Sequence, residues 1–164
     1  MSPKNQPLNK TILFTRHTIA LDHDIARRNK ISDANRPLTS AGITKFRKIT
    51  QRHKKQFKKV DIFLTSPLLR ARQTLALIME LKSAQKHKPT IYKYIRYSDS
   101  PEHFLKWIRK TKFEKIVAVS HEPYMSHFMV LLLGKKWPNR KIKKSQIIKI
   151  KFSGRTISFK FLTA

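Results

Sequence analysis

The chain of 164 residues contains no cysteine and only three glycines. The lack of cysteine excludes disulfide bonds, thiolate catalysis and metal sites with cysteine ligands. Gly42, Gly134 and Gly154 are too few and too scattered to form a glycine-rich phosphate loop or a dinucleotide-binding fingerprint. Any phosphate ligand must therefore be bound mainly by side chains, and the guanidinium group of arginine suits phosphate best.

Long hydrophobic runs are also absent. The longest candidate, residues 128–133, is far shorter than the roughly 18 residues that a membrane helix needs, so we expect no membrane insertion. No apolar stretch typical of an export signal precedes Thr11, and we expect a cytoplasmic protein. Hydrophobic residues still make up 40% of the chain, enough for a folded core. We therefore expect a single domain over residues 1–164, in which residues 1–9 form a flexible segment.

Acidic residues are scarce: nine Asp and Glu stand against 37 Lys and Arg, for a formal net charge of +28. A field of this sign concentrates anions at the surface, and it permits phosphorylated molecules, acidic proteins, nucleic acid and anionic membranes as partners. The lysines are spread along the whole chain, so the charge can equally reflect a basic proteome. No recognised nucleic-acid-binding motif occurs, so we expect at most non-specific binding of nucleic acid.

Short β-branched and aromatic runs alternate with helical patterns along the chain. The predicted strands cover residues 10–15, 60–65, 90–94 and 114–120, and the predicted helices cover 38 to about 57, 68–81, 101–112 and 121–133. Residues 146–152 and 156–162 predict a hairpin around Ser153 and Gly154. Residues 18–37 form a polar stretch without a clear pattern. The alternation predicts an α/β fold with a mostly parallel sheet and a C-terminal antiparallel hairpin.

Ligands of open α/β sheets bind at the edge where the parallel strands end. Arg16 and His17 follow the first predicted strand, Arg70 comes shortly after the second, and His121 follows the strand 114–120. We therefore expect two arginines and two histidines to converge at one edge of the sheet. Such groups attract anions, and a neutral imidazole nitrogen is a nucleophile near neutral pH.

These residues resemble the motifs of the histidine phosphatase superfamily. The similar segments are Arg16-His17, Arg36-Pro37-Leu38-Thr39 with Gly42, residues 66–74 (SPLLRARQT) and Ser120-His121. The resemblance covers residues 12–161, and the short length and motif spacing are most similar to those of the SixA-type phosphohistidine phosphatases. It implies a three-layer α/β/α sandwich of the phosphoglycerate mutase-like fold, with the site at the carboxyl edge of the sheet. It also implies that no metal and no organic cofactor is needed.

The resemblance implies that His17 is the nucleophile and that Arg16, Arg70 and His121 complete the phosphate pocket. His17 would take the phosphoryl group onto its imidazole, the arginines and a protonated His121 would neutralise the charge of the oxygens, and water would then release phosphate. The expected substrate is a histidine-phosphorylated protein, and we expect a monomer. Two alternatives stay open: a broad phosphomonoesterase for small molecules, and a weakly active basic module that binds anionic partners.

Two positions depart from the family pattern. Thr18 stands where the family usually has glycine, and its hydroxyl could donate to the phosphate or its bulk could narrow the pocket. Larger members also carry a carboxylic acid that protonates the leaving oxygen; Asp99 is the best candidate here, with a helix N-cap as its alternative role. The lack of an obvious acid suits phosphohistidine, whose leaving group is an imidazole. Glu122, next to His121, is a further candidate for substrate contact.

A metal site has little support in the sequence. The cluster Asp22-His23-Asp24 contains the residue types of a metal site, but we interpret it as a polar loop segment.

Overall fold

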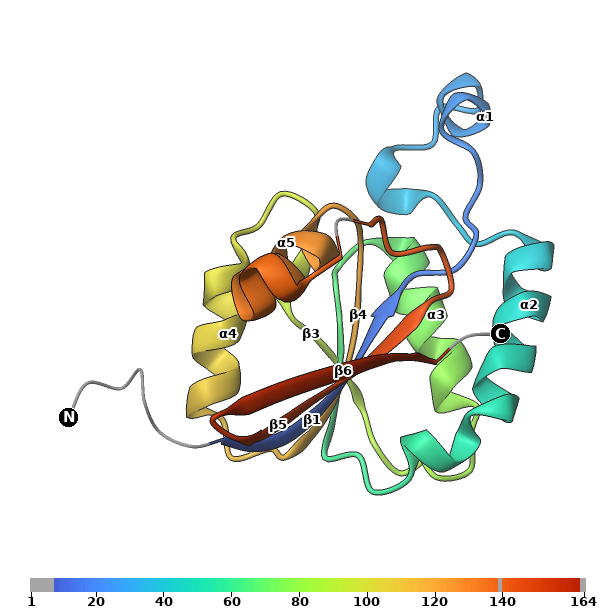
Figure 1. Ribbon diagram of the computed structural model, residues 1–164. Coiled ribbons are helices and arrows are strands. Elements are labelled where there is room, and N and C mark those ends of the chain that lie inside the picture. The colour runs from blue at the N-terminus through green and yellow to red at the C-terminus, as the bar shows by residue number, and fades with distance from the viewer. Residues whose placement is uncertain (1–7, 139, 163–164) are drawn as a thin grey trace.

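The computed structural model describes residues 8–138 and 140–162, which form a six-stranded sheet between two layers of helices (Figure 1). The strands are β1 (Leu8–Arg16), β2 (Ile62–Thr65), β3 (Pro89–Ile91), β4 (Lys115–Ser120), β5 (Ile147–Gly154) and β6 (Thr156–Leu162). The α-helices are α1 (His23–Arg28), α2 (Ser40–Arg52), α3 (Leu69–Met79), α4 (Pro101–Lys110) and α5 (Tyr124–Leu133). Short 3₁₀-helices follow several of these elements: η2 (Asp33–Asn35), η3 (Lys54–Phe57), η4 (Lys93–Ile95) and η5 (Gly134–Lys136).

The strand order in the sheet is β3-β2-β4-β1-β5-β6. The first four strands of this order are parallel, while β5 is antiparallel to β1 and β6 is antiparallel to β5. This arrangement confirms the predicted α/β fold with a mostly parallel sheet and a C-terminal antiparallel hairpin. Because β1, β2 and β4 run in the same direction side by side, the segments that follow them meet at one edge of the sheet.

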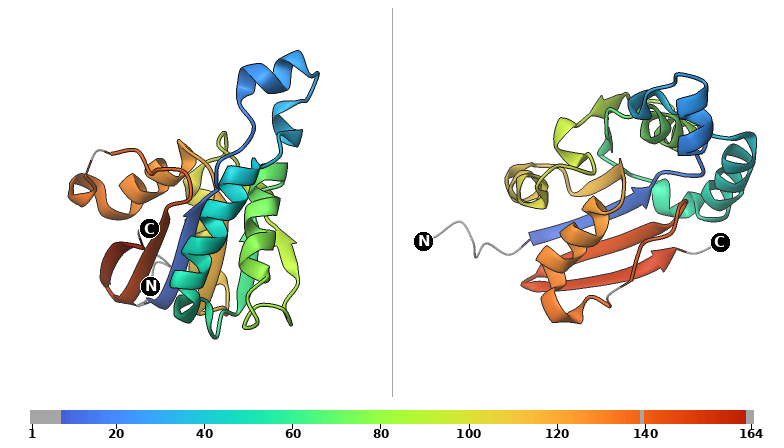
Figure 2. Two further views of the ribbon diagram at one scale, coloured as in Figure 1. Left: turned by 90° about the vertical axis from the view of Figure 1, so that its right-hand side faces the viewer. Right: turned by 90° about the horizontal axis from the view of Figure 1, so that it is seen from above.

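Successive side chains of the central strands pack on opposite faces of the sheet, as the period of a strand requires. Leu13 belongs to the core under α2 and α3, together with Phe46 and Leu75. Phe14 belongs to the core under α4 and α5, where its ring lies 5.9 Å from that of Phe104 and 5.3 Å from that of Phe128. The views in Figure 2 show these two pairs of helices on opposite faces of the sheet. The sandwich therefore has three layers, as the resemblance implies.

The N-terminal boundary of the sheet differs from the prediction. Residues 8 and 9, which we expected in a flexible segment, belong to β1, where Leu8 pairs with Gly154 and Asn9 with Ser153. The amide side chain of Asn9 also accepts a hydrogen bond from the backbone N–H of Gly154. The long hairpin strand β5 supplies these partners, which a local reading of the sequence cannot include. Residues 1–7 of the predicted segment lie outside the described residues.

The polar stretch 18–37 is more ordered than its sequence pattern suggests. It contains α1 and η2, and Figure 1 shows α1 standing clear of the sheet beyond the end of β1. The carboxylate of Asp22 caps α1 by accepting a hydrogen bond from the backbone N–H of Asp24 at 2.8 Å. In α1 only Ala26 is buried, so the helix has no apolar face that periodicity could reveal. No helix in the described part of the chain is long and apolar enough to cross a membrane.

Candidate active site

A cavity of about 640 Å³ opens at the carboxyl edge of the sheet. The four residues that the sequence predicts to converge all line it: Arg16, His17, Arg70 and His121. The rest of the lining comes from Asp22, His23, Asp33, Arg36, Tyr97, Glu122 and Lys144. The fold therefore joins residues from the ends of three parallel strands with residues from the α1–η2 segment and from the loop before β5.

The register between β1 and β4 places the two histidines side by side. Arg16, the last residue of β1, pairs with Ser120, the last residue of β4. The backbone N–H of His17 donates to the carbonyl oxygen of Ser120 at 3.0 Å, and the next residue after Ser120 is His121. The ring centroids of His17 and His121 are 5.1 Å apart. A slip of one residue in this register would turn one of the two rings to the other face of the sheet.

The imidazole of His17 has the tautomer that a nucleophile needs. Its Nδ1 lies 2.7 Å from the carbonyl oxygen of Thr18, which can only accept, so Nδ1 carries the proton and Nε2 keeps a free lone pair. Burial lowers the pKa of His17 to about 3, and the charges of Arg70, Arg16 and Lys144 add to this effect. His17 is therefore neutral at physiological pH.

His121 is buried without a protein partner for its ring. Its exposed fraction is 2%, and neither ring nitrogen has a hydrogen-bond partner among the described residues. Burial, followed by the neighbouring His17 and the charges of Arg70 and Arg16, lowers the pKa of His121 to about 2. We expected a protonated His121, whereas these surroundings favour the neutral ring. A bound anion would supply the missing partner, and its charge would raise the pKa again.

The two predicted arginines are held by the chain but keep a free donor each. Arg70 donates from Nη1 to the carbonyl oxygen of Asp33 at 2.7 Å and from Nη2 to its carboxylate at 3.2 Å. Arg16 donates from Nη1 to the carbonyl oxygen of Ile142 at 2.5 Å. The Nε atoms of Arg16 and Arg70 are buried and have no partner among the described residues. Burial lowers the pKa of both guanidinium groups, which nevertheless remain cations.

Asp33 links two arginines of the cavity, and we did not single it out from the sequence. Its carboxylate accepts from Nε of Arg36 at 2.9 Å and from Nη2 of Arg70 at 3.2 Å. Burial alone would raise the pKa of Asp33, but the hydrogen bonds and charges of Arg36 and Arg70 lower it below its usual value. The only sequence signal is the position of Asp33 three residues before Arg36, a residue of the family motif.

Thr18 does not do what either sequence interpretation expected. Its side chain is fully buried, and its hydroxyl lies 3.0 Å from the carbonyl oxygen of Gly42 and 2.7 Å from the hydroxyl of Ser145. Thr18 is not one of the described residues that line the cavity. The predicted substrate contact of Thr18 is corrected: its hydroxyl is bound to Gly42 and Ser145 and holds these neighbouring segments together.

Asp99, the predicted general acid, is likewise not one of the described residues that line the cavity. Its carboxylate accepts from the backbone N–H of Arg96 at 2.7 Å and from the Arg96 guanidinium at 3.1 Å, so it closes a local turn. This corrects the prediction that Asp99 protonates a leaving group. Tyr97, two residues earlier, lines the cavity instead, and its ring is 6.5 Å from that of His121.

Glu122, for which we expected a substrate contact, is one of the residues that line the cavity. Its carboxylate is already used, because it accepts from the backbone N–H of Ile142 at 2.6 Å and from the hydroxyl of Ser126 at 2.8 Å. The charge of Glu122 also raises the pKa of Arg16, against the larger effect of burial. Glu122 therefore stabilises the wall of the cavity by linking the start of α5 to the segment of Ile142.

The acidic and histidine side chains that the structure describes form no cluster suited to a metal ion. Within residues 8–138 and 140–162, no group of three or more His, Asp or Glu side chains could hold a metal ion. In the cluster that we interpreted as a polar loop segment, Asp22 caps α1 and Asp24 pairs with Arg27 at 3.1 Å.

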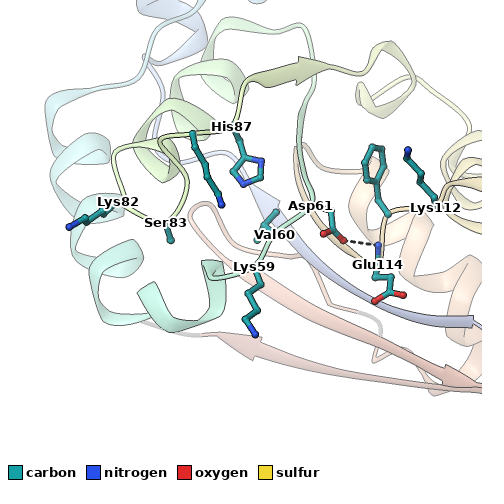
Figure 3. A pocket seen from close by; sticks show the side chains of 10 residues that line it. Lys59, Val60, Asp61, Lys82, Ser83, His87, Lys112 and Glu114 are labelled. Atoms are coloured by element: carbon teal, nitrogen blue, oxygen red, sulfur yellow. Dashed lines mark hydrogen bonds between the residues drawn. The ribbon is translucent and has the colours of Figure 1, made fainter.

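A larger hollow of about 860 Å³ lies at the opposite edge of the sheet (Figure 3). Its lining comes from the segments that precede β2, β3 and β4, and includes Lys59, Asp61, Lys82, His87, Lys112 and Glu114. The buried side-chain nitrogen and oxygen atoms that lack partners, among the described residues, all belong to Thr15, Arg16, Arg70 and His121, and none lines this hollow. Chemistry rather than size therefore identifies the site.

Comparisons with known proteins point to one family for this chain. Residues 12–91 match the model of the family described as histidine phosphatase superfamily (branch 1). An uncharacterized protein from Picosynechococcus sp. is 32% identical over 141 residues, which cover 84% of this chain and 82% of that protein.

Solved structures of low sequence identity share the fold. The protein histidine phosphatase SixA, complexed with tungstate, has a TM-score of 0.75 at 21% identity, over 92% of this chain and 94% of that chain. A phosphoserine phosphatase mutant from Entamoeba histolytica, in complex with phosphoserine, has a TM-score of 0.68 at 16% identity, over 94% and 97%. The phosphoglycerate mutase from Bacillus anthracis has a TM-score of 0.65 at 13% identity, over 94% and 93%. With its motifs, its fold and its family match, the chain belongs to the histidine phosphatase superfamily.

Proposed function

We propose that this protein is a phosphohistidine phosphatase that works through a covalent phosphohistidine on His17. The observation that carries the proposal is the pairing of a neutral His17, whose Nε2 is free, with buried donors that lack partners in the same cavity. Those donors come from Arg16, Arg70 and His121. A phosphoryl group would satisfy all of them at once and would lie against the nucleophile.

The reaction would proceed in two displacements. Nε2 of His17 attacks the phosphorus, a bond forms between them, and the bond from phosphorus to the leaving group breaks. Arg16, Arg70 and an N–H of His121 stabilise the negative charge of the phosphoryl oxygens. Water then attacks phospho-His17, inorganic phosphate leaves, and the imidazole is free again. No metal or organic cofactor takes part in this scheme.

The engagement of the nearby carboxylates supports phosphohistidine as the substrate. Asp99 is bound to Arg96, and Glu122 is bound to Ile142 and Ser126, so neither is free to protonate a leaving group. An alkoxide needs such an acid, whereas the imidazole of phosphohistidine titrates near neutral pH and can be protonated before its bond to phosphorus breaks. We therefore expect faster turnover of phosphohistidine than of alkyl phosphates. A histidine-phosphorylated protein is the substrate that we propose.

A small phosphorylated molecule is the second candidate substrate. The cavity volume of about 640 Å³ lies within the range of small-ligand sites. Tyr97 lines the cavity, and its phenol is a group that could protonate a leaving oxygen. Turnover of a phosphohistidine protein, an aryl phosphate and sugar phosphates decides between the two candidates, and equal rates on all of them would remove the reason for a phosphohistidine preference.

The covalent step is tested by trapping the labelled protein after brief exposure to a radiolabelled substrate. We expect an acid-labile, alkali-stable label in the wild type and in His127→Ala, because His127 is exposed on α5 outside the cavity lining. We expect His17→Ala to lose the label and to lose turnover by a factor of at least about a thousand, since it removes the nucleophile. A label that survives in His17→Ala would contradict the proposed role of His17.

A further inference from the structure

The acidic side chains that line the cavity are all engaged by donors of the chain itself. Asp22 caps α1, Asp33 accepts from Arg36 and Arg70, and Glu122 accepts from a backbone N–H and a hydroxyl. These carboxylates already accept hydrogen bonds, which leaves them little capacity to bind a further cation. The groups that remain available to a ligand are donors and positive charges.

These available groups lie at two depths. The buried tier consists of the unpartnered nitrogens of Arg16, Arg70 and His121. The outer tier contains Lys144, whose side chain is exposed and forms no hydrogen bond or ion pair with any described residue. The charge of Lys144 nevertheless contributes to the lowered pKa of His17, so it acts on the nucleophile. Lys144 is thus an uncommitted cation at the mouth of a cavity whose floor suits a phosphoryl group.

The loop that carries Lys144 is fastened to the segment of the nucleophile. The backbone N–H of Ser145 donates to the carbonyl oxygen of His17 at 3.2 Å, and its hydroxyl lies 2.7 Å from that of Thr18. Ser145 is buried and has a φ of 69°, a left-handed conformation that serine rarely adopts without support from its surroundings. On the other side, the side chain of Gln146 accepts from the backbone N–H of Lys143 at 3.0 Å.

These contacts place Thr18 in a definite role. A glycine at position 18, as the family usually has, could not offer a hydroxyl to Ser145. Thr18 is therefore a positioning residue, which ties the loop of Lys144 to the residue after the nucleophile. The ammonium group moves on a flexible stem, but the backbone that carries it is held at the cavity.

We propose that Lys144 is a specificity-determining residue that binds a second anionic group of the substrate, next to the phosphoryl group. This rests on the proposed function, in which the buried tier takes the phosphoryl group. The substrate class is a phosphorylated molecule with a carboxylate close to the phosphoryl group. Such a carboxylate can come from a small phosphorylated acid or from an acidic residue that flanks a phosphohistidine.

The test compares phenyl phosphate with carboxyphenyl phosphate, which differ only in the carboxylate. We expect wild-type kcat/KM to favour carboxyphenyl phosphate, and Lys144→Gln to reduce this preference roughly fivefold, the upper range for an exposed ion pair. Lys143→Gln is the matched control, because Lys143 is an exposed neighbour on the same loop and is not part of the cavity lining. Phosphohistidine peptides with acidic or neutral flanks form a second pair, which distinguishes a protein source of the carboxylate from a small acid.

Three outcomes would overturn the proposal: no preference in the wild type, an unchanged preference in Lys144→Gln, or an equal loss on both aryl phosphates. The last outcome would mean that Lys144 contacts the phosphoryl group itself. If neither aryl phosphate is turned over, the proposed function fails for these substrates. Calorimetric affinities of the same two compounds for wild type and Lys144→Gln then still test the contact, with the same roughly fivefold change expected.

Discussion

His17 and His121 are neutral because burial and neighbouring cations both oppose an imidazolium. Of the two rings, only that of His17 has a hydrogen-bond partner among the described residues: its Nδ1 donates to the carbonyl oxygen of Thr18. His121 has none among the described residues. In the proposed mechanism, the first ring is therefore oriented as the nucleophile and the second is available to bind the phosphoryl group.

The lowered pKa values of the two histidines predict how the stability of the protein depends on pH. The pKa values of His17 and His121 are lowered in the folded state to about 3 and about 2, so between there and pH 6.5 the unfolded chain binds more protons. The free energy of unfolding therefore falls as the pH drops below 6.5, by up to about 2 kcal/mol for each histidine at pH 5. Urea unfolding at pH 7 and pH 5 measures the loss.

His121→Gln separates this effect from other acid-sensitive contacts. The variant should lose less stability than the wild type between pH 7 and pH 5, whereas His127→Gln, on the exposed face of α5, should behave like the wild type. Inorganic phosphate should oppose the loss, because an anion in the cavity favours protonated histidine. Identical pH dependence in wild type and His121→Gln would contradict the burial of a neutral His121.

At the scale of elements, the cavity depends on close packing between α2 and the segment that follows β1. Thr39 caps α2 by accepting from the backbone N–H of Gly42 at 3.0 Å, and Thr18 contacts the carbonyl oxygen of the same glycine. A Cβ atom at position 42 would lie 2.3 Å from the carbonyl oxygen of Ile19, which is backbone and cannot simply rotate away. Glycine is therefore required at position 42 by the close approach of α2 to Ile19, two residues after His17.

Gly42→Ala should consequently destabilise the protein by about 1–3 kcal/mol, the usual range for overpacking. It should also lower kcat, because the segment that orients His17 must shift. Thermal unfolding and steady-state kinetics measure the two effects. The control is Ala41→Ser, at an exposed neighbouring position of the same helix, which should be close to wild type. Wild-type stability of Gly42→Ala would mean that α2 does not approach the segment this closely.

At the scale of the whole molecule, a net charge of +28 surrounds a cavity that suits an anion. The charge predicts electrostatic attraction of any phosphorylated substrate. It does not single out the cavity, since lysines also line the hollow at the opposite edge of the sheet. The buried contacts thus define the site, whereas the surface charge affects how fast a substrate reaches the protein.

We therefore expect kcat/KM to fall several-fold as sodium chloride rises from about 0.02 M to 0.5 M, because salt screens exposed charges within a few ångströms. The kcat value should change much less, since the chemical step uses buried groups that are screened less. Kinetics at matched pH over this range check the expectation. If kcat/KM is independent of salt, the charge has no part in substrate capture, and a basic proteome is the better explanation for it.

Local patterns were enough to predict the α/β class, the parallel strands and the four groups that meet at their ends. This is because β-branched runs, helical periodicity and strand-end positions are properties of neighbouring residues. They were not enough for α1, which has only Ala26 buried, or for residues 8 and 9, whose partners lie in β5. The roles expected of Thr18 and Asp99 were wrong for a related reason, since side-chain direction depends on contacts made elsewhere in the chain.

The sequence by itself determined which chemistry is available: without cysteine or a glycine-rich loop, an imidazole and guanidinium groups remain to handle a phosphoryl group. Only the tertiary structure decided which of these groups are free. Arg70 uses part of its guanidinium group to donate to Asp33, and the hydroxyl of Thr18 is hydrogen-bonded to that of Ser145. The side chain of Lys144 has no partner among the described residues. The physical reason is that a hydrogen bond is set by distances of a few ångströms between segments far apart in the chain, and only folding fixes those distances.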